Sequence, residues 1–172
     1  MRRWQKTFFV TAILLVFTGS IVFASIVQDR PTVVTGAELT RLVPNSFYFK
    51  GQSAPTQMRN TSAAKFGTER YVIVGLVDTS GYSAEVRSYY EGFFITDSPI
   101  KVNGESLATG AYGFGFTNDG KMNILDLAGN KLLTVTSTND KNLRRPRPLM
   151  MTLAEEGIRF YTRRDYVTIT AN

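Results

Sequence analysis

The stretch from residue 107 to residue 136, LATGAYGFGFTNDGKMNILDLAGNKLLTVT, combines alternating apolar residues with two turn signals. Every second residue from 112 to 116 is aromatic, so an extended chain places these rings on one face of a strand. Residues 118–120 (Asn-Asp-Gly) and 129–130 (Gly-Asn) tolerate the positive φ angles that tight turns require. The stretch therefore predicts an antiparallel meander of three strands, from which the rest of the fold is built outward.

Two registers are open for the first turn of this meander. A two-residue loop would place Phe114 opposite Leu125. A three-residue loop, with Gly120 in the left-handed conformation, would place Phe114 opposite Ile124 and a second aromatic opposite Met122. We favour the three-residue loop, because it gives both aromatic side chains an apolar partner near the turn.

The other face of the first meander strand is almost bare, because Gly113 and Gly115 carry no side chain. Glycine inside a strand weakens it unless another part of the structure must approach closely. We therefore expect a neighbouring sheet or helix to pack on these glycines, with a ligand surface as the alternative.

The N-terminal segment has the features of an export signal. A basic start precedes an apolar run, and Val22 and Ala24 occupy the −3 and −1 positions of a cleavage site. Residues 1–24 are therefore predicted to be a secretory signal peptide. The alternative is an uncleaved membrane anchor through residues 7–27, since that run approaches the length of a spanning helix. Either reading predicts an exported protein, periplasmic or extracellular.

The remaining chain has the size of one domain. Residues 25–37 are polar with few aromatics and are expected to form a linker or loosely docked arm, and residues 38–172 to form the domain. Three of the 20 Lys and Arg residues lie in the signal segment, which leaves 17 against 14 acidic residues. So small an excess of positive charge predicts no nucleic-acid partner.

The sequence contains no cysteine and no histidine. Disulfides, thiol nucleophiles, Cys/His zinc sites and imidazole catalysis are therefore excluded. The acidic residues at turns lack the spacing of a calcium loop, so we expect no metal site and no cofactor. An exported domain of this composition must be held together by its hydrophobic core.

The pattern along residues 38–172 is that of an all-β protein. The apolar, β-branched run at residues 70–79 predicts a central strand covered on both faces. Ser83 is a good N-cap for one short helix near residues 84–91. Short strands separated by turns then predict a single antiparallel barrel or sandwich of about eight to ten strands.

Aromatic residues gather around the predicted helix, and they are the first candidate ligand-binding site. In a barrel, the helix could close one mouth over a pocket in which tyrosine hydroxyls fix a small apolar ligand. In a sandwich, the same residues would be a plug that fills one end, and we favour this plug because aromatics at helical spacing usually mark a core face. The candidate residues are Tyr82, Tyr89, Tyr90 and Phe93.

A second candidate site is the densest charge cluster after residue 24, in which two prolines separate basic residues. Such a patch could contact lipid headgroups, anionic glycans or an acidic protein partner, whereas a solvated surface loop is the alternative without function. The patch consists of Lys141, Arg144, Arg145 and Arg147.

A carboxylate-dependent hydrolase is a weaker hypothesis. Residues 78–81, Asp-Thr-Ser-Gly, are close to the Asp-Thr-Gly loop of aspartic proteases, in which two carboxylates share a proton. Ser80 interrupts the motif, and the sequence has no second copy of it. The simpler interpretation is that Asp78 ends a strand before the helix, so no catalytic residue is assigned.

Four segments together resemble an uncharacterised family of small exported bacterial β proteins. These segments are LVDTSGYS (residues 76–83), LATGAYGFGF (107–116), LLTVTST (132–138) and RRPRPL (144–149). The resemblance covers roughly residues 38–172 and implies an exported β fold without implying an activity.

The sequence thus favours an extracytoplasmic, non-enzymatic β domain that binds a partner or a small apolar ligand through the end carrying the helix. A purely structural or interaction module of the cell envelope is the alternative. A hydrolase that uses Asp78 is the third hypothesis.

Overall fold

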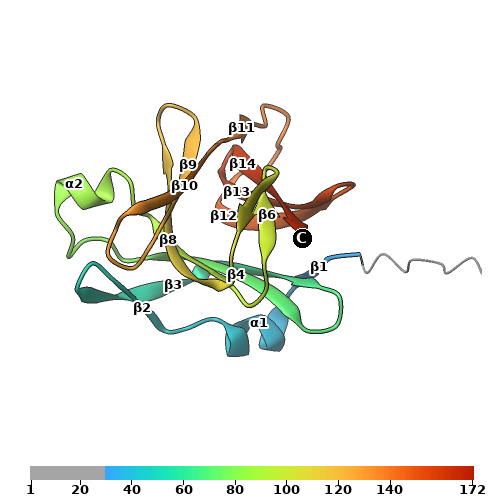
Figure 1. Cartoon of the computed structure of the whole chain (residues 1–172), viewed down its shortest axis with the longest axis horizontal. Coiled ribbons are helices and arrows are strands. Elements are labelled where there is room, and N and C mark those ends of the chain that lie inside the picture. Colours follow the sequence, from blue (N-terminus) through green and yellow to red (C-terminus); the bar gives the residue numbers. More distant parts are fainter. Residues whose placement is uncertain (1–29) are drawn as a thin grey trace, which may run out of the picture.

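The structure is a computed structural model that describes residues 30–172, and it consists of two antiparallel sheets packed face to face (Figure 1). One sheet has eight strands and the other has six, and the two do not join into a closed barrel. The all-β prediction is confirmed, and the arrangement is that of a sandwich. The strands outnumber the expected eight to ten, because several are pairings of only two or three residues.

The eight-stranded sheet has the order β1-β3-β4-β5-β8-β9-β10, and β2 pairs with β3. Its strands are β1 (Thr32–Val34), β2 (Ser46–Phe49), β3 (Gln52–Phe66), β4 (Arg70–Val77), β5 (Gly92–Thr96), β8 (Gly110–Thr117), β9 (Lys121–Leu125) and β10 (Lys131–Thr136). The expected central strand is β4, which lies between β3 and β5. Residues 55–59 lie within β3, whose pairing with β4 is irregular between Thr56 and Thr61.

The six-stranded sheet has the order β12-β13-β14-β6-β7, and β11 pairs with β14. Its strands are β6 (Ile100–Val102), β7 (Glu105–Leu107), β11 (Thr138–Asn139), β12 (Arg147–Ala154), β13 (Gly157–Arg163) and β14 (Asp165–Ala171). The β6–β7 hairpin turns at Asn103 and Gly104, where φ is +48° and +87°. This hairpin leads the chain from the second sheet back to β8 of the first.

The predicted meander is β8, β9 and β10, and its register is the favoured one. Phe114 lies opposite Ile124 and Phe116 opposite Met122, so the loop has three residues. Gly120 adopts a φ of +74° in this loop, the left-handed conformation that glycine tolerates best.

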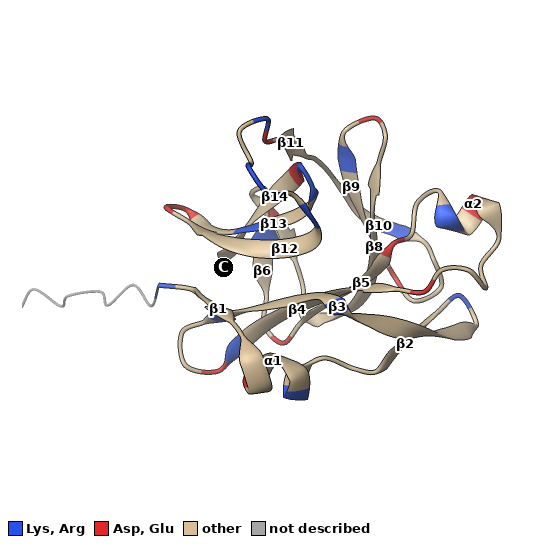
Figure 2. Cartoon of the chain, turned by 180° about the vertical axis from the view of Figure 1, so that it is seen from behind, with Lys and Arg blue, Asp and Glu red and all other residues tan. Residues whose placement is uncertain are grey.

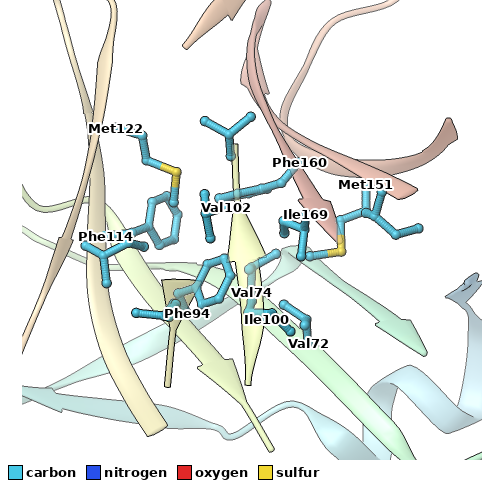
Figure 3. Close-up of a cluster of buried hydrophobic side chains, with 14 of the residues drawn as sticks. Val72, Val74, Phe94, Ile100, Val102, Phe114, Met122, Met151, Phe160 and Ile169 are labelled. Carbon is cyan, nitrogen blue, oxygen red and sulfur yellow. The ribbon is translucent and has the colours of Figure 1, made fainter. Parts of the chain in front are cut away.

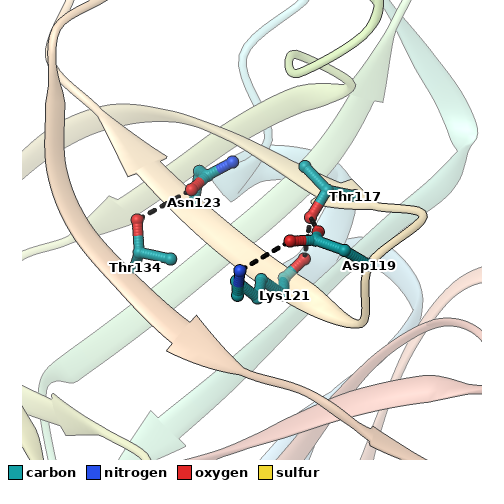
Figure 4. A network of polar contacts seen from close by, with 5 residues as sticks. All are labelled: Thr117, Asp119, Lys121, Asn123 and Thr134. Atoms are coloured by element: carbon teal, nitrogen blue, oxygen red, sulfur yellow. Dashed lines mark hydrogen bonds and ion pairs between the residues drawn. The ribbon is translucent and has the colours of Figure 1, made fainter.

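Polar contacts hold the first turn and the third strand of the meander (Figure 4). The Asp119 carboxylate accepts a hydrogen bond from the Thr117 hydroxyl and lies 2.6 Å from the Lys121 ammonium. Lys121 and Thr117 together hold the pKa of Asp119 below its ordinary value. On the next strand, the Thr134 hydroxyl donates to the buried Asn123 side chain at 2.8 Å, so β10 is joined to β9 by a side-chain bond as well.

The main hydrophobic core lies between the two sheets (Figure 3). Alternate residues of β4 and β8 point into it, as the two-residue period of a strand requires. Phe160 of β13 forms its centre, because its ring packs edge-on against those of Phe94, Phe114 and Phe116 at centroid distances of 6.1, 5.1 and 5.7 Å. These contacts tie the two sheets together through one residue of the second sheet.

A second hydrophobic cluster covers the opposite face of the eight-stranded sheet, and we call it the aromatic plug. In this cluster, side chains of the β2–β3 hairpin and of the segment around α2 (Ala84–Arg87) pack on residues of β4, β5 and β9 that point away from the second sheet. Its buried members are Val43, Phe47, Phe49, Ala54, Val77, Tyr82, Val86, Tyr90, Phe93 and Leu125.

The bare face of β8 lies under this plug. A Cβ atom on Gly113 would lie 2.6 Å from the Phe49 ring, and one on Gly115 would lie 2.2 Å from the backbone oxygen of Tyr89. The expectation that another part of the fold packs on these glycines is confirmed, because only glycine leaves room for that approach.

Two features of the N-terminal half differ from expectation. Residues 32–34 form β1, which pairs with β3, and α1 (Gly36–Leu42) follows directly, so this part of the expected arm belongs to the fold. Leu39, Leu42 and Val43 stand at helical spacing, but three apolar residues before Pro44 are too short a pattern to predict α1. The expected signal peptide or anchor (residues 1–24 and 7–27) and residues 25–29 of the arm lie outside the described residues.

The predicted helix near residues 84–91 is present but shorter. Ser83 is its N-cap, accepting a hydrogen bond from the Val86 amide at 3.3 Å, as expected. The helix ends at Arg87, because the Glu91 amide already donates to the Phe114 carbonyl at 2.8 Å and draws the chain into the sheet.

Candidate functional site

The first predicted site, the aromatic residues near the helix, is part of the aromatic plug. Tyr82, Tyr90 and Phe93 are 7%, 1% and 0% exposed, and the Tyr90 ring stacks on Phe49 at a centroid distance of 3.9 Å. Tyr89 is half-buried, and its hydroxyl accepts a hydrogen bond from Lys50 at 3.2 Å. The rings therefore pack against one another, which is the arrangement that the plug interpretation predicts.

The hydroxyls of the plug are also turned inward. The Tyr82 hydroxyl donates toward the backbone oxygens of Phe49 and Gln52 at 3.1 and 3.3 Å. The Tyr90 hydroxyl is buried and has no hydrogen-bond partner among residues 30–172. Burial raises the pKa of both phenols, so both remain neutral. Neither hydroxyl is placed to orient a ligand arriving from solvent.

The second predicted site, the basic cluster, lies on the loop between β11 and β12 and at the start of β12. All of its four members are exposed: Lys141, Arg144, Arg145 and Arg147. The loop has a defined shape, because Arg164 holds it from the β13–β14 turn. The Arg164 Nη1 atom lies 3.2, 3.2 and 2.8 Å from the carbonyl oxygens of residues 140, 141 and 143.

The structure divides the predicted basic cluster into two parts. Arg147 lines a groove of about 580 Å³ at the end of the sandwich, while the other three side chains lie outside that lining. We call this hollow the basic groove. Its lining consists of Leu76, Glu91, Pro146, Arg147, Pro148, Arg163 and Arg164.

Two arginines of the basic groove face each other across a pair of strands. Arg147 of β12 is the register partner of Arg163 of β13, and a bulge follows between Arg147 and Met150. Like charges directly opposite each other destabilise a sheet unless other groups compensate. The bulge contains Pro148, a residue without an amide hydrogen that a regular ladder position would not accept.

Glu91 supplies the one carboxylate in the groove lining. Its Oε1 atom lies 3.3 Å from Arg163, and its Oε2 atom accepts the Phe116 amide at 3.0 Å. Glu91 is thus fixed at the end of β8 and aligns Arg163. Within residues 30–172, Arg147 and Arg164 have no carboxylate within 4.0 Å.

The backbone at Arg163 is unusual. Its φ of +58° lies in the left-handed region, which costs a residue with a side chain about 1–2 kcal/mol. Thr162 pairs with Asp165, so Arg163 and Arg164 form a two-residue turn between β13 and β14. Lys50 and Asn103 also have positive φ angles in two-residue hairpin turns, so the turn itself accounts for this conformation.

A larger hollow, about 650 Å³, lies at the other end of the sandwich, beside residue 30. Its charged residues are Arg30, Glu155 and Glu156, and the two glutamates form the tip of the β12–β13 hairpin. Figure 2 shows this red tip apart from the blue positions around β11 and the opposite end of β13. The two ends of β12 and β13 therefore carry opposite charge.

The candidate hydrolase residue has no catalytic surroundings. The Asp78 Oδ1 atom accepts the Ser80 amide at 3.0 Å, a turn-forming contact within an exposed loop. This bond holds the pKa of Asp78 below its ordinary value, the opposite of what a carboxyl group sharing a proton requires. Among residues 30–172, no group of three acidic side chains is arranged to hold a metal ion.

Four lining residues were not identified from the sequence: Leu76, Glu91, Arg163 and Arg164. The sequence held a signal for Arg163. Regular pairing on either side of the turn at Glu155 and Glu156 brings residue 163 to within one position of residue 147, and the bulge accounts for that one-residue shift. The contribution of Glu91 depends on the packing of the two sheets and has no local signal.

No protein-family model matches this chain, and neither a curated protein nor a solved structure matches it significantly. In the part of the chain that the structure describes, no helix has the length and apolarity needed to span a lipid bilayer.

Proposed function

We propose that this chain is a non-enzymatic, extracytoplasmic binding module that engages an anionic partner through the basic groove. Export is supported by the N-terminal segment, with its basic start and apolar run. A role without catalysis is supported by the lack of histidine and cysteine and by the turn-forming position of Asp78. The resemblance to small exported β proteins agrees with this location.

The observation that carries the proposal is the opposition of Arg147 and Arg163 across β12 and β13. Two guanidinium groups from these positions line one groove with Arg164 and a single carboxylate. An anionic group bound between them would offset a repulsion that Glu91, which pairs with Arg163 alone, offsets only in part. The basic residues outside the lining would raise the rate of encounter with such a partner.

The first sequence hypothesis, a small apolar ligand held by the aromatic residues near the helix, loses support because those rings are buried against one another. The alternative is a structural or interaction module of the envelope, whose contacts would not depend on the groove. The two-layer core supports that alternative, since it is closed by the chain's own side chains.

A binding assay with a soluble polyanion tests the proposal. We would measure binding of sulfated dextran to the purified full-length chain, and to a chain carrying Arg147→Gln and Arg163→Gln. The matched control carries Arg41→Gln on α1 and Lys131→Gln on β10, two exposed cations away from the groove.

The groove variant is expected to bind at least about tenfold more weakly, because a hydrogen bond to a charged group contributes roughly 1.5–3 kcal/mol. The control should stay close to the unmodified chain, and added salt should weaken all binding. An equal loss in both variants would show that only overall charge matters. No binding by the unmodified chain would favour the structural module.

A further inference from the structure

The basic groove has an apolar side as well as a charged side. Leu76, Pro146 and Pro148 line it together with the three arginines and Glu91. Leu76 packs against the main core yet remains partly exposed, so its side chain borders both the core and the groove. A purely ionic ligand would leave this apolar surface in contact with water.

The charge of the lining sets the charge of the ligand. Three arginines and one glutamate leave an excess of two positive charges. A phosphate monoester carries about −1.5 to −2 at neutral pH, which matches this excess, whereas a carboxylate or a phosphate diester carries only about −1. Arginine side chains also fit the geometry of phosphate oxygens well.

The spacing of the arginines fits one such group. Antiparallel partners have Cα atoms roughly 4.5–5.5 Å apart, so side chains from Arg147 and Arg163 can reach a single phosphate. Glu91 fixes one of these arginines, and Arg164 is fixed by three carbonyl groups. Arg163 and Arg164 are thus partly oriented before a ligand binds, which lowers the entropic cost of binding.

We propose that the basic groove binds a phosphate monoester with an apolar substituent. The phosphate lies between Arg147 and Arg163, and the substituent lies on Leu76, Pro146 and Pro148. This inference rests on the proposed function and specifies its ligand class. The same chemistry occurs in a lipid with a monoester headgroup and in a soluble alkyl or aryl phosphate.

Calorimetric titration of the full-length chain with hexyl phosphate, inorganic phosphate, hexanoate and hexanol tests this ligand class. Hexyl phosphate is expected to bind at least about tenfold more tightly than each of the other three, because it alone combines a phosphate monoester with an apolar chain that the groove can bury. Equal affinity for hexyl phosphate and inorganic phosphate would overturn the inference.

Substitutions test the charged side and the apolar side of the groove separately. Arg147→Gln should abolish binding of both phosphates, while Arg144→Gln, outside the groove lining, should change neither by more than about twofold. Leu76→Ala should remove the preference for hexyl phosphate and keep the binding of inorganic phosphate. Pro146→Ser repeats that test at an exposed position, in case the loss of Leu76 impairs folding. Hexyl phosphate binding that survives Arg147→Gln would contradict the assignment.

Vesicles of phosphatidylcholine containing phosphatidic acid or phosphatidylglycerol identify the source of the ligand. Binding that requires phosphatidic acid, a monoester, supports a lipid headgroup, and binding to hexyl phosphate alone supports a soluble phosphomonoester. Binding to sulfated dextran without any preference for hexyl phosphate would overturn this inference and leave the proposed function in place. Binding of no anion would overturn both.

Discussion

The aromatic plug and the basic groove are supplied by adjoining residues, yet they use their side chains in opposite ways. Tyr90 is buried in the plug, and the next residue, Glu91, lines the groove. In the plug, side chains meet their partners within the chain, with Phe49 and Tyr90 stacked at 3.9 Å. In the groove, Arg147 and Arg163 face each other, and the lining contains three arginines but only one carboxylate. The plug therefore makes its contacts within the chain, whereas the groove leaves charged side chains open to solvent.

The largest expected effect is on stability, from truncation in the plug. Tyr90→Ala should lower the free energy of unfolding by roughly 3–5 kcal/mol, because it leaves a cavity beside Phe49 and Tyr82. Tyr90→Phe should be close to neutral, since it removes a buried hydroxyl that has no hydrogen-bond partner. Urea unfolding of the three chains measures both values. A Tyr90→Ala chain of unchanged stability would contradict the assignment of this residue to a core.

The next effect comes from the close approach of the plug to β8. Gly115→Ala should destabilise the fold by about 3 kcal/mol, because the new Cβ atom would lie 2.2 Å from the Tyr89 carbonyl oxygen. Gly81→Ala is the control, since its nearest neighbour, on the flexible Gln52 side chain, is 3.8 Å away. Thermal unfolding compares the two. Similar melting temperatures for both variants would show that the plug does not press on this strand.

A smaller effect is expected where the groove is organised. Arg164→Gln removes three contacts to loop carbonyls and should cost about 1–2 kcal/mol of unfolding free energy. It should also speed amide hydrogen exchange at residues 140–145 while leaving exchange in β4 unchanged. Exchange that stays slow in the loop would mean that Arg164 does not hold it.

The smallest effect on stability is expected at the strained position. Arg163→Gly loses a surface ion pair with Glu91, worth about 0–1 kcal/mol, and relieves a φ of +58° that costs a similar amount. The free energy of unfolding should therefore change by less than about 1 kcal/mol. Anion binding should nevertheless fall, so this variant separates function from stability. A large loss of stability would show that the ion pair is structural.

Much of the fold could be predicted from local patterns. The alternation from Tyr112 to Phe116, together with the turn at Gly120, predicted the meander and its register, because strand period and turn chemistry are properties of neighbouring residues. The N-cap at Ser83 was predicted for the same reason. The helix α1 was missed, since it holds too few apolar residues at helical spacing to stand out, and its Leu39 packs against a cluster built from distant parts of the chain.

The candidate site was less predictable. The basic cluster was identified by its charge density. Charge density does not show that Arg147 lines a groove while Arg144 does not, and it does not distinguish a groove from a solvated loop. Glu91 and Leu76 enter the site only because the two sheets meet there. The helical spacing of the aromatic residues favoured a plug over a pocket but did not decide between them, because the deciding contact, Phe49 on Tyr90, joins segments 41 positions apart.

The most direct test of the account is a two-dimensional amide NMR titration of the labelled full-length chain with hexyl phosphate. We expect chemical shift changes at Leu76, Arg147, Arg163 and Arg164, which line the basic groove, and none at Tyr82 or Val86 in the aromatic plug. Changes centred on Tyr82 and Val86, with the groove residues unaffected, would contradict the account.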